Sequence, residues 1–284
     1  MEPSHLLNML GGNPPLPDAL DDVAVRAGRK LARRARRRRA QFDPHVCEAL
    51  LGELSLTSQG ERELASWGVD AAVAQALGFR SIDDAPGWRH CLRQLRTRLG
   101  EAAVARAGFA DPPWRGCVSV LVMPYRYRGE LVAIRLRNLA AKTNTRFWTP
   151  GLAAPSAPFN ADALDAASGG EIHLVADELE ACTLSSYGPL AVSVSGIGAL
   201  SERWIPLLAG MHLLVVWYRD DDTAGGYQAG LHRALEGRLG AEWVRTHARA
   251  VAVPHAPSGA PLAIQGAQRR GMLADVASQA PWRS

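Results

Sequence analysis

The second half of this 284-residue chain alternates short apolar segments with longer amphipathic ones, and this alternation restricts the fold more than any other feature. The apolar segments, such as MHLLVVWY, are nearly continuous, as in strands that are covered on both faces. Strands that are joined through helices run parallel in one sheet. The sequence therefore predicts an α/β fold with a mainly parallel sheet flanked by helices. The predicted strands are residues 171–176, 190–195, 211–218 and 248–253, with the second and fourth expected at the periphery.

A β-hairpin and a helical region are predicted before this sheet. The segment CVSVLVMPYRYRGELVAIRLRN holds two apolar runs around a glycine-containing turn, which is typical of a hairpin. The segment LTSQGERELASWGVDAAVAQALGF predicts two short helices that are broken at Gly68, with Asp70 as a candidate N-cap for the second. The chain is therefore divided into four parts: a basic helical region (1–110), a basic hairpin subdomain (111–168), the parallel-sheet domain (169–255) and a C-terminal tail (256–284).

Composition excludes several classes of protein. Apolar residues make up 47% of the chain and charged residues 21%, which is enough to bury a core and excludes general disorder. No window approaches the roughly eighteen consecutive apolar residues of a membrane span, and the N-terminus lacks the pattern of a secretory signal. We therefore expect a cytoplasmic protein without membrane contact. The four cysteines lack CxxC or CxxH spacing and the eight histidines lack HxxxH or HExxH spacing, so a structural zinc site is not expected.

Two stretches of the helical region are strongly basic. From Arg26 to Arg39, nine of fourteen residues are arginine or lysine, within a helix expected over about 18–41. Guanidinium groups at this density suit phosphate, whose oxygens accept paired hydrogen bonds. The second stretch runs from about residue 88 to 107 and has apolar residues at helical spacing. We predict nucleic-acid binding by the first run, with a solvated face or a protein-docking arm as the alternative. The expected contacts are Arg33, Arg34, Arg36 and Arg37.

Acidic residues follow two of the predicted strands, at the point where each strand ends. In an open parallel sheet, functional residues lie just beyond the carboxyl ends of the strands. Two carboxylates spaced two residues apart, as in Asp220 and Asp222, suit a hard divalent cation such as Mg²⁺. The alternative is a solvated turn whose acids cap the following helix. The acids after the first strand are Asp177, Glu178 and Glu180, and those after the third are Asp220, Asp221 and Asp222.

Several of these segments together resemble the Toprim domain, which occurs in DnaG-type bacterial primases, phage primase-helicases, topoisomerases and nucleases of the overcoming-lysogenization-defect type. The sequence DDDTAG, which begins at Asp220, is similar to the DxDxAG step of that domain, and ELEACTLSSYG and SVSGIGAL resemble the segments before it. Primases of this group place a basic hairpin and a basic-aromatic loop before Toprim. The predicted hairpin, followed by Lys142 and Arg146-Phe147-Trp148, looks similar. The resemblance covers about residues 115–255.

The resemblance implies a Toprim-like parallel sheet and a chemistry of primer synthesis. A member of this group transfers nucleotides with two divalent cations, Mg²⁺ or Mn²⁺, which stabilise the attacking and leaving oxygens. The implied partners are single-stranded or template DNA, nucleoside triphosphates and a helicase or other replication protein, in the replication of a phage or mobile element. The implied catalytic residues are Asp177, Glu178, Glu180, Asp220 and Asp222, of which Asp220, Asp222 and Glu180 would hold metal. Template and triphosphate would contact Arg135, Arg137, Lys142 and Arg146.

The chain departs from the Toprim pattern at the position of its glutamate. Toprim strand one normally ends in Glu-Gly followed by xx-Asp-Ala, and setting Glu180-Ala181 on the Asp-Ala step puts Ala176 at the glutamate position. Alanine can neither bind a metal nor transfer a proton. The chain also contains no Walker A loop and no zinc-binding module. Two alternatives to a primase-like enzyme therefore stay open: a DNA-binding accessory protein with a weakened or inactive site, and a Toprim nuclease.

Overall fold

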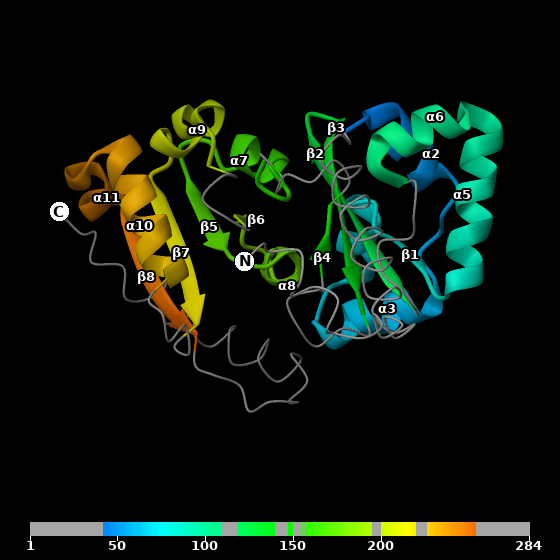
Figure 1. The fold of residues 1–284 in the computed structure, drawn as a ribbon. Coiled ribbons are helices and arrows are strands. Elements are labelled where there is room, and N and C mark those ends of the chain that lie inside the picture. The colour runs from blue at the N-terminus through cyan, green and yellow to red at the C-terminus, as the bar shows by residue number, and fades with distance from the viewer. Residues whose placement is uncertain are drawn as a thin grey trace, which may run out of the picture.

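Two β-sheets alternate with three layers of helices in this protein (Figure 1). A computed structural model describes residues 42–109, 119–139, 147–149, 155, 157–194, 200–219 and 226–253. The first sheet is antiparallel, with the strand order β1-β2-β3-β4: β1 (Arg80–Ile82), β2 (Val120–Tyr127), β3 (Glu130–Asn138) and β4 (Phe147–Trp148). The second sheet is parallel, with the order β6-β5-β7-β8: β5 (Glu171–Val175), β6 (Ala191–Ser193), β7 (Leu213–Arg219) and β8 (Ala248–Val253).

The parallel sheet confirms the fold class that the apolar segments predicted. All of its strand pairs are parallel, and β6 and β8 lie at the edges, as expected for the second and fourth strands. Strands β5 and β7 are direct neighbours, with Leu174 opposite Val216. Because neighbouring parallel strands end on the same side, the carboxyl ends of β5 and β7 share one edge of the sheet. Asp177 follows β5 at this edge.

The predicted hairpin is also present. Strands β2 and β3 pair antiparallel from Val120 opposite Asn138 to Tyr127 opposite Glu130, with a β-bulge between Tyr125 and Arg126. The two turn residues, Arg128 and Gly129, both have positive φ, at 52° and 81°. This backbone matches a two-residue turn whose twist follows that of the strands.

The helical region before the hairpin follows the sequence in part. Helices α3 (Ser58–Ser66) and α4 (Ala71–Ala76) are separated at Gly68, whose φ is +73°, and the Asp70 side chain caps α4 by accepting a hydrogen bond from Ala72 N at 2.7 Å. Strand β1, which pairs with β2, was not predicted. The helix expected over 18–41 lies outside the described residues, and the domain boundaries stay predictions. The helices of this region are α2 (Pro44–Gly52), α3 (Ser58–Ser66), α4 (Ala71–Ala76), α5 (Ala85–Leu99) and α6 (Glu101–Val104), with a π-turn over Ala105–Phe109.

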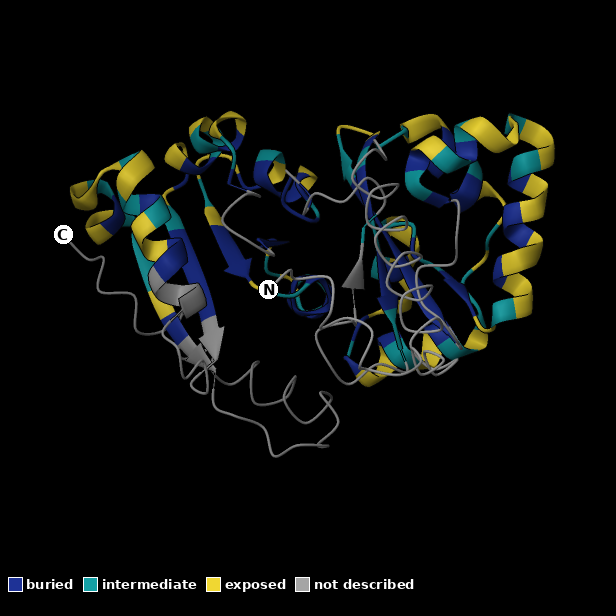
Figure 2. Ribbon diagram, viewed as in Figure 1, coloured by how far each residue is buried: buried dark blue, intermediate teal, exposed yellow. Residues whose placement is uncertain are grey.

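Three apolar cores join the layers, and Figure 2 shows their buried residues on the inner sides of the helices. The outer core lies between α2, α5 and α6 and one face of the antiparallel sheet. The third core lies between the parallel sheet and the remaining helices. These helices are α7 (Asp162–Ala166), α9 (Ile205–Ala209), α10 (Gly226–Leu239) and α11 (Ala241–His247), with a 3-10 turn over Glu202–Trp204.

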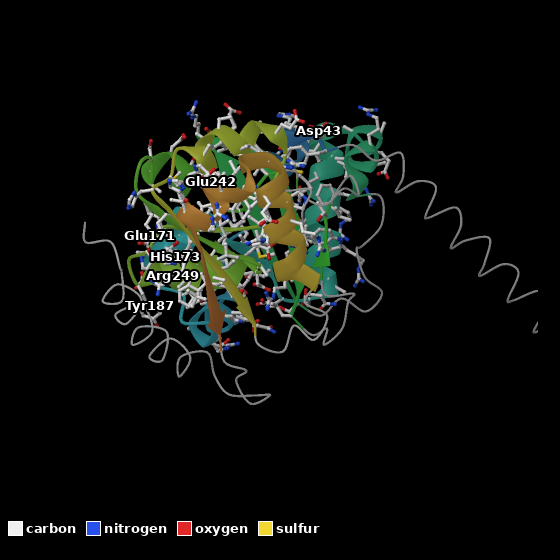
Figure 3. The ribbon with its side chains drawn as sticks, turned by 90° about the vertical axis from the view of Figure 1, so that its left-hand side faces the viewer. Asp43, Glu171, His173, Tyr187, Glu242 and Arg249 are labelled. Carbon is white, nitrogen blue, oxygen red and sulfur yellow. The ribbon has the colours of Figure 1, made fainter. Side chains whose placement is uncertain are left out.

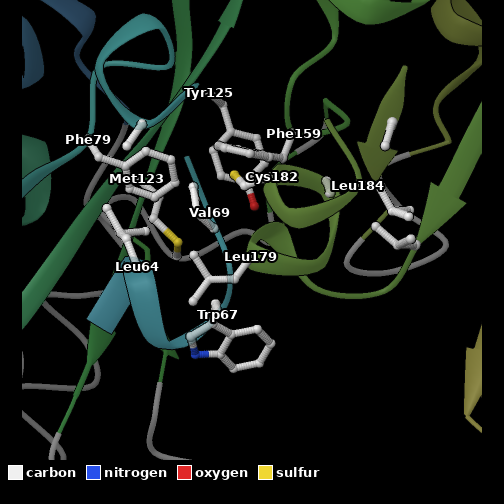
Figure 4. Packing of buried hydrophobic residues seen from close by; sticks show 14 of the residues in the cluster. Leu64, Trp67, Val69, Phe79, Met123, Tyr125, Phe159, Leu179, Cys182 and Leu184 are labelled. Atoms are coloured by element: carbon white, nitrogen blue, oxygen red, sulfur yellow. The ribbon is translucent and has the colours of Figure 1, made fainter. Parts of the chain in front are cut away.

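The middle core packs the two sheets together through α8 (Glu178–Ser186) (Figure 4). Leu179 and Cys182 of α8 meet Met123 and Tyr125 of β2, and α3 and α4 close the same core. Polar contacts cross this layer over long sequence distances. The Thr183 hydroxyl donates to the Trp67 carbonyl at 2.7 Å, and Asp70 N donates to the Ser186 hydroxyl at 2.8 Å, each across 116 residues. The two halves of the chain are therefore one packed body.

The parallel sheet also contains a buried histidine with both ring nitrogens bonded. His173 lies on β5, near Glu171 and Arg249 in the side view of Figure 3. Trp217 Nε1 donates to His173 Nδ1 at 2.8 Å, so Nε2 carries the proton that faces Glu171 Oε1, also at 2.8 Å. This bond lowers the pKa of Glu171, against the effect of burial. His173 is thus a satisfied core residue, as its isolation in the sequence indicates.

No described helix is both long and apolar enough to cross a membrane. The described cysteines, Cys47, Cys91 and Cys182, are free and buried, and burial raises the pKa of Cys91 to about 12. Such thiols stay protonated and unreactive at neutral pH.

The hairpin turn provides a test of backbone strain. We expect Gly129→Ala to destabilise the protein by about 1–2 kcal/mol, because φ is positive there. A steric clash would not contribute, since an added Cβ meets no atom within 4 Å. Gly237→Ala, in the exposed part of α10 and equally free of contacts, should stabilise it by about 0.5–1 kcal/mol. Urea denaturation of both variants measures the difference. Equal effects would contradict the assigned turn.

Candidate functional site

The edge where β5 and β7 end is the place for a functional site in this fold, and α8 begins there. Asp177 is the N-cap of α8, and its carboxylate accepts a hydrogen bond from Leu179 N at 2.9 Å. The next residue, Glu178, opens the first turn of the helix. Both carboxylates therefore lie at the N-terminal end of a helix, where its dipole favours negative charge.

Asp177 forms an ion pair with an arginine of the hairpin. Arg137, on β3, donates through NH1 to both carboxylate oxygens of Asp177, at 3.0 and 3.1 Å. The Arg137 side chain is completely buried, while Asp177 keeps 18% of its side-chain surface exposed. The guanidinium carbon lies 4.6 Å from the centre of the Trp67 ring. Arg137 is thus held between a carboxylate and an aromatic face, which is the environment that a buried guanidinium needs.

Glu178 forms a second, deeper ion pair. Its side chain is fully buried, and Oε1 accepts hydrogen bonds from the Tyr125 hydroxyl and from Arg135 NH1. Burial raises the pKa of Glu178, and the positive charge of Arg135 opposes this effect. Burial alone would lower the pKa of Arg135, but the carboxylate of Glu178 reverses the direction. Burial raises the pKa of Tyr125 too, so this hydroxyl stays protonated and donates.

These five residues, Tyr125, Arg135, Arg137, Asp177 and Glu178, form what we call the hairpin clasp. Arg135 and Arg137 stand two residues apart on β3 and so project from the same face of the sheet. The two acids are consecutive at the start of α8, and Tyr125 lies on the neighbouring strand β2. The clasp therefore joins the antiparallel sheet to the helix that the parallel sheet positions.

The tip of the hairpin has a contact of its own. Arg128, in the turn, donates through Nε to Asp165 at 2.8 Å, and its backbone N donates to Asp162, both on α7. Tyr127 packs edge-on against Trp204, with 4.8 Å between the ring centres. The hairpin is thus attached to the parallel-sheet half at its base and at its tip.

The structure brings together residues for which the sequence analysis predicts separate roles. Arg135 and Arg137 were predicted to hold template and triphosphate, and Asp177 and Glu178 to serve catalysis; the four pair with one another. Glu180 lies in the first turn of α8 and is 7% exposed. The other predicted site residues lie outside the described residues: Arg33, Arg34, Arg36, Arg37, Lys142, Arg146, Asp220 and Asp222.

The described residues of this edge do not by themselves form a metal site. Ala176 is exposed at the end of β5, and its carbonyl accepts a hydrogen bond from the Ser193 hydroxyl at 3.3 Å. No three metal-binding side chains gather among the described residues. Asp177 and Glu178 are engaged with arginines, and moving either toward a cation would leave a buried guanidinium without its counter-charge.

Sequence reasoning missed Tyr125 and Trp67 as parts of this site. A signal for the pairing was present. Arg135 and Arg137 are two residues apart on β3, and the other residues of this strand on the same face are apolar. Two arginines on a face that packs against protein require carboxylates nearby. The sequence alone does not say which carboxylates these are.

Comparison with known proteins places the fold. No protein-family model matches the chain, and no curated protein matches its sequence. Solved structures do match. The zinc-binding and RNA polymerase domains of the Aquifex aeolicus primase give a TM-score of 0.56 over 81% of this chain, at 15% identity. A DnaG primase catalytic domain bound to ssDNA gives 0.55 over 82%, at 15% identity. A DNA primase domain from Pseudomonas aeruginosa gives 0.53 over 78%, at 17% identity.

The chain spans 60%, 81% and 72% of these three structures, respectively. At such low identity the likeness concerns the fold and not the chemistry. The mixed α/β architecture, with a helix-flanked parallel sheet next to an antiparallel one, is that of a primase catalytic core.

The clasp predicts a large difference between two arginines of the same hairpin. We expect Arg137→Met to lower the free energy of unfolding by about 3–5 kcal/mol, because Asp177 loses its counter-charge in a largely buried place. Arg126→Met, which removes the half-exposed pair with Glu48, should cost only about 0–1 kcal/mol. Urea denaturation measures both.

A double-mutant cycle with Asp177→Asn isolates the pair, since asparagine preserves the helix cap. We expect the double variant to be more stable than the sum of the single effects predicts. Additive effects would show that Arg137 and Asp177 do not interact.

Proposed function

We propose that this protein is a primase-related DNA-binding protein whose phosphoryl-transfer site is weakened. One observation carries the proposal: in a primase-core fold, the two acids that follow β5 are bound to hairpin arginines, and the residue before them is alanine. A site whose acids after β5 are bound to arginines keeps a surface for binding and has fewer carboxylates for catalysis. The expected ligand is single-stranded or template DNA.

Metal-dependent nucleotidyl transfer is the second candidate, and the topology of the sheet favours it. Strands β5 and β7 are adjacent and parallel, and Asp220 directly follows the last residue of β7. Mg²⁺ or Mn²⁺ would be held by Asp220, Asp222 and Glu180. A cation bound there would stabilise the attacking and leaving oxygens of the transfer. Nucleoside triphosphates, a helicase partner and a role in the replication of a phage or mobile element belong to this candidate.

A single incubation distinguishes these functions. The protein is mixed with labelled single-stranded DNA, labelled nucleoside triphosphates and Mg²⁺ or Mn²⁺. Retained DNA binding without any product supports the proposal. Labelled oligomers that disappear in an Asp220→Asn/Asp222→Asn variant establish the transferase, and cleaved DNA establishes a Toprim nuclease. Absence of DNA binding overturns the proposal.

The arginine-rich run provides the second test. We expect replacement of Arg33, Arg34, Arg36 and Arg37 by alanine to weaken DNA binding equally for all sequences, because phosphate contacts carry no base information. The log–log salt dependence on single-stranded DNA should become shallower by about 2–3, at about 0.7 per lost phosphate contact. Fluorescence anisotropy over a salt series measures both. An unchanged affinity at low salt would assign the run to protein docking.

Position 176 tests the weakened site. We expect millimolar Mg²⁺ to raise the melting temperature of the Ala176→Glu variant more than that of the parent. A ligand that binds only the folded state adds about 2.7 kcal/mol to the free energy of unfolding at a hundredfold excess over Kd. Ala176→Gln is the matched control, since it has the same shape without the charge. If all three proteins respond equally to Mg²⁺, residue 176 does not face a metal site, and Asp177 or Glu178 becomes the counterpart of the Toprim glutamate.

A further inference from the structure

Helix α5 has a basic outer face that the candidate site does not use. Its inner face buries Trp88, Cys91, Leu92 and Leu95 in the outer core, and Figure 2 shows the opposite side of the helix as exposed. Arg89 and Arg93 are exposed on this side, and Arg96, three residues further on, is half-buried. Residues at this spacing lie in one row, which is about 10 Å long.

The charge of this row is of one sign. Helix α5 contains no acidic residue between Ala85 and Leu99. Arg96 pairs with Glu101 at 2.9 Å, whereas Arg89 and Arg93 form no ion pair with any described residue. A helix face that is only solvated usually mixes both signs of charge. Two neighbouring guanidinium groups without a counter-charge among the described residues, those of Arg89 and Arg93, instead favour a polyanion.

We infer that this face of α5 binds the phosphate backbone of duplex DNA. This inference rests on the proposed DNA-binding function and adds a second contact surface to it. The duplex is favoured because the face offers cations and no exposed tryptophan, tyrosine or phenylalanine: Trp88 is 1% exposed, and the one exposed large apolar side chain among the described residues is Leu190, in another part of the chain. Single strands are bound largely by stacking on aromatic side chains, whereas phosphate contacts alone suffice for a duplex.

The place of α5 in the fold agrees with this role. It belongs to the outermost layer, on the opposite face of the antiparallel sheet from the hairpin clasp (Figure 1). A duplex on α5 therefore does not compete with a strand at the edge of the parallel sheet. Phe42 packs on the same outer core, three residues after the end of the arginine-rich run.

The test compares two variants with the same loss of charge. Arg89→Gln/Arg93→Gln removes the row on α5, and Arg233→Gln/Arg245→Gln removes two exposed helical arginines of α10 and α11. Arginine and glutamine have similar helix propensities, so both variants should fold, which circular dichroism checks. Binding of a 20-bp duplex and of a single strand of the same sequence is measured by fluorescence anisotropy over a salt series.

We expect the α5 variant to lose duplex affinity, with a salt slope shallower by about 1.8, at about 0.9 per phosphate contact, and the control variant to bind like the parent. The affinity of the α5 variant for the single strand should change less than its affinity for the duplex. If the parent binds DNA and the α5 variant binds the duplex as the control does, the inference is wrong and the proposed function stands. A larger loss on the single strand would also overturn it. If the parent binds neither DNA, the proposed function fails as well.

Discussion

The buried ion pairs between β3 and α8 determine how the two halves of this protein fit together. A charge that is removed from water costs several kcal/mol, and only a partner in good geometry offsets that cost. Arg137 meets this condition with both oxygens of Asp177 and the face of Trp67, and Arg135 meets it with Glu178. Apolar contacts alone would allow α8 to shift along the sheet by small amounts. Paired charges allow one register, because each carboxylate must meet its own guanidinium.

Much of the fold was predictable because it depends on local signals. The parallel sheet followed from apolar runs separated by helices, and the hairpin from a glycine between two such runs. Asp70 caps α4 as its position suggested. Strand β1 was missed because three residues, Arg80–Ile82, are too few to show a period. They become a strand only because β2 lies beside them.

The site was predictable only as far as its chemistry was local. The acids at the end of β5 could be found from the strand that precedes them. Their partners could not, because Arg137 and Asp177 are 40 residues apart and no local pattern links them. As the N-cap of α8, Asp177 turns its side chain toward its own helix, and in this orientation its carboxylate also meets Arg137 of the hairpin. Acids that follow a strand, where catalytic residues are expected, can therefore form structural ion pairs instead.

Two hydrogen bonds cross the middle core, one between Trp67 and Thr183 and one between Asp70 and Ser186. During synthesis, the first residue of each pair must wait for the second. Each joins residues 116 positions apart, so helices α3 and α4 leave the ribosome long before α8 exists. At a synthesis rate of about 5–20 residues per second, the apolar side of α3 and α4 waits about 6–23 s for its partner. During this interval the nascent chain exposes Leu64 and the ring that later covers Arg137. Closing so long a loop also slows folding, since its entropy is lost before the contact forms. Helices α3 and α4 therefore need protection from aggregation while translation proceeds.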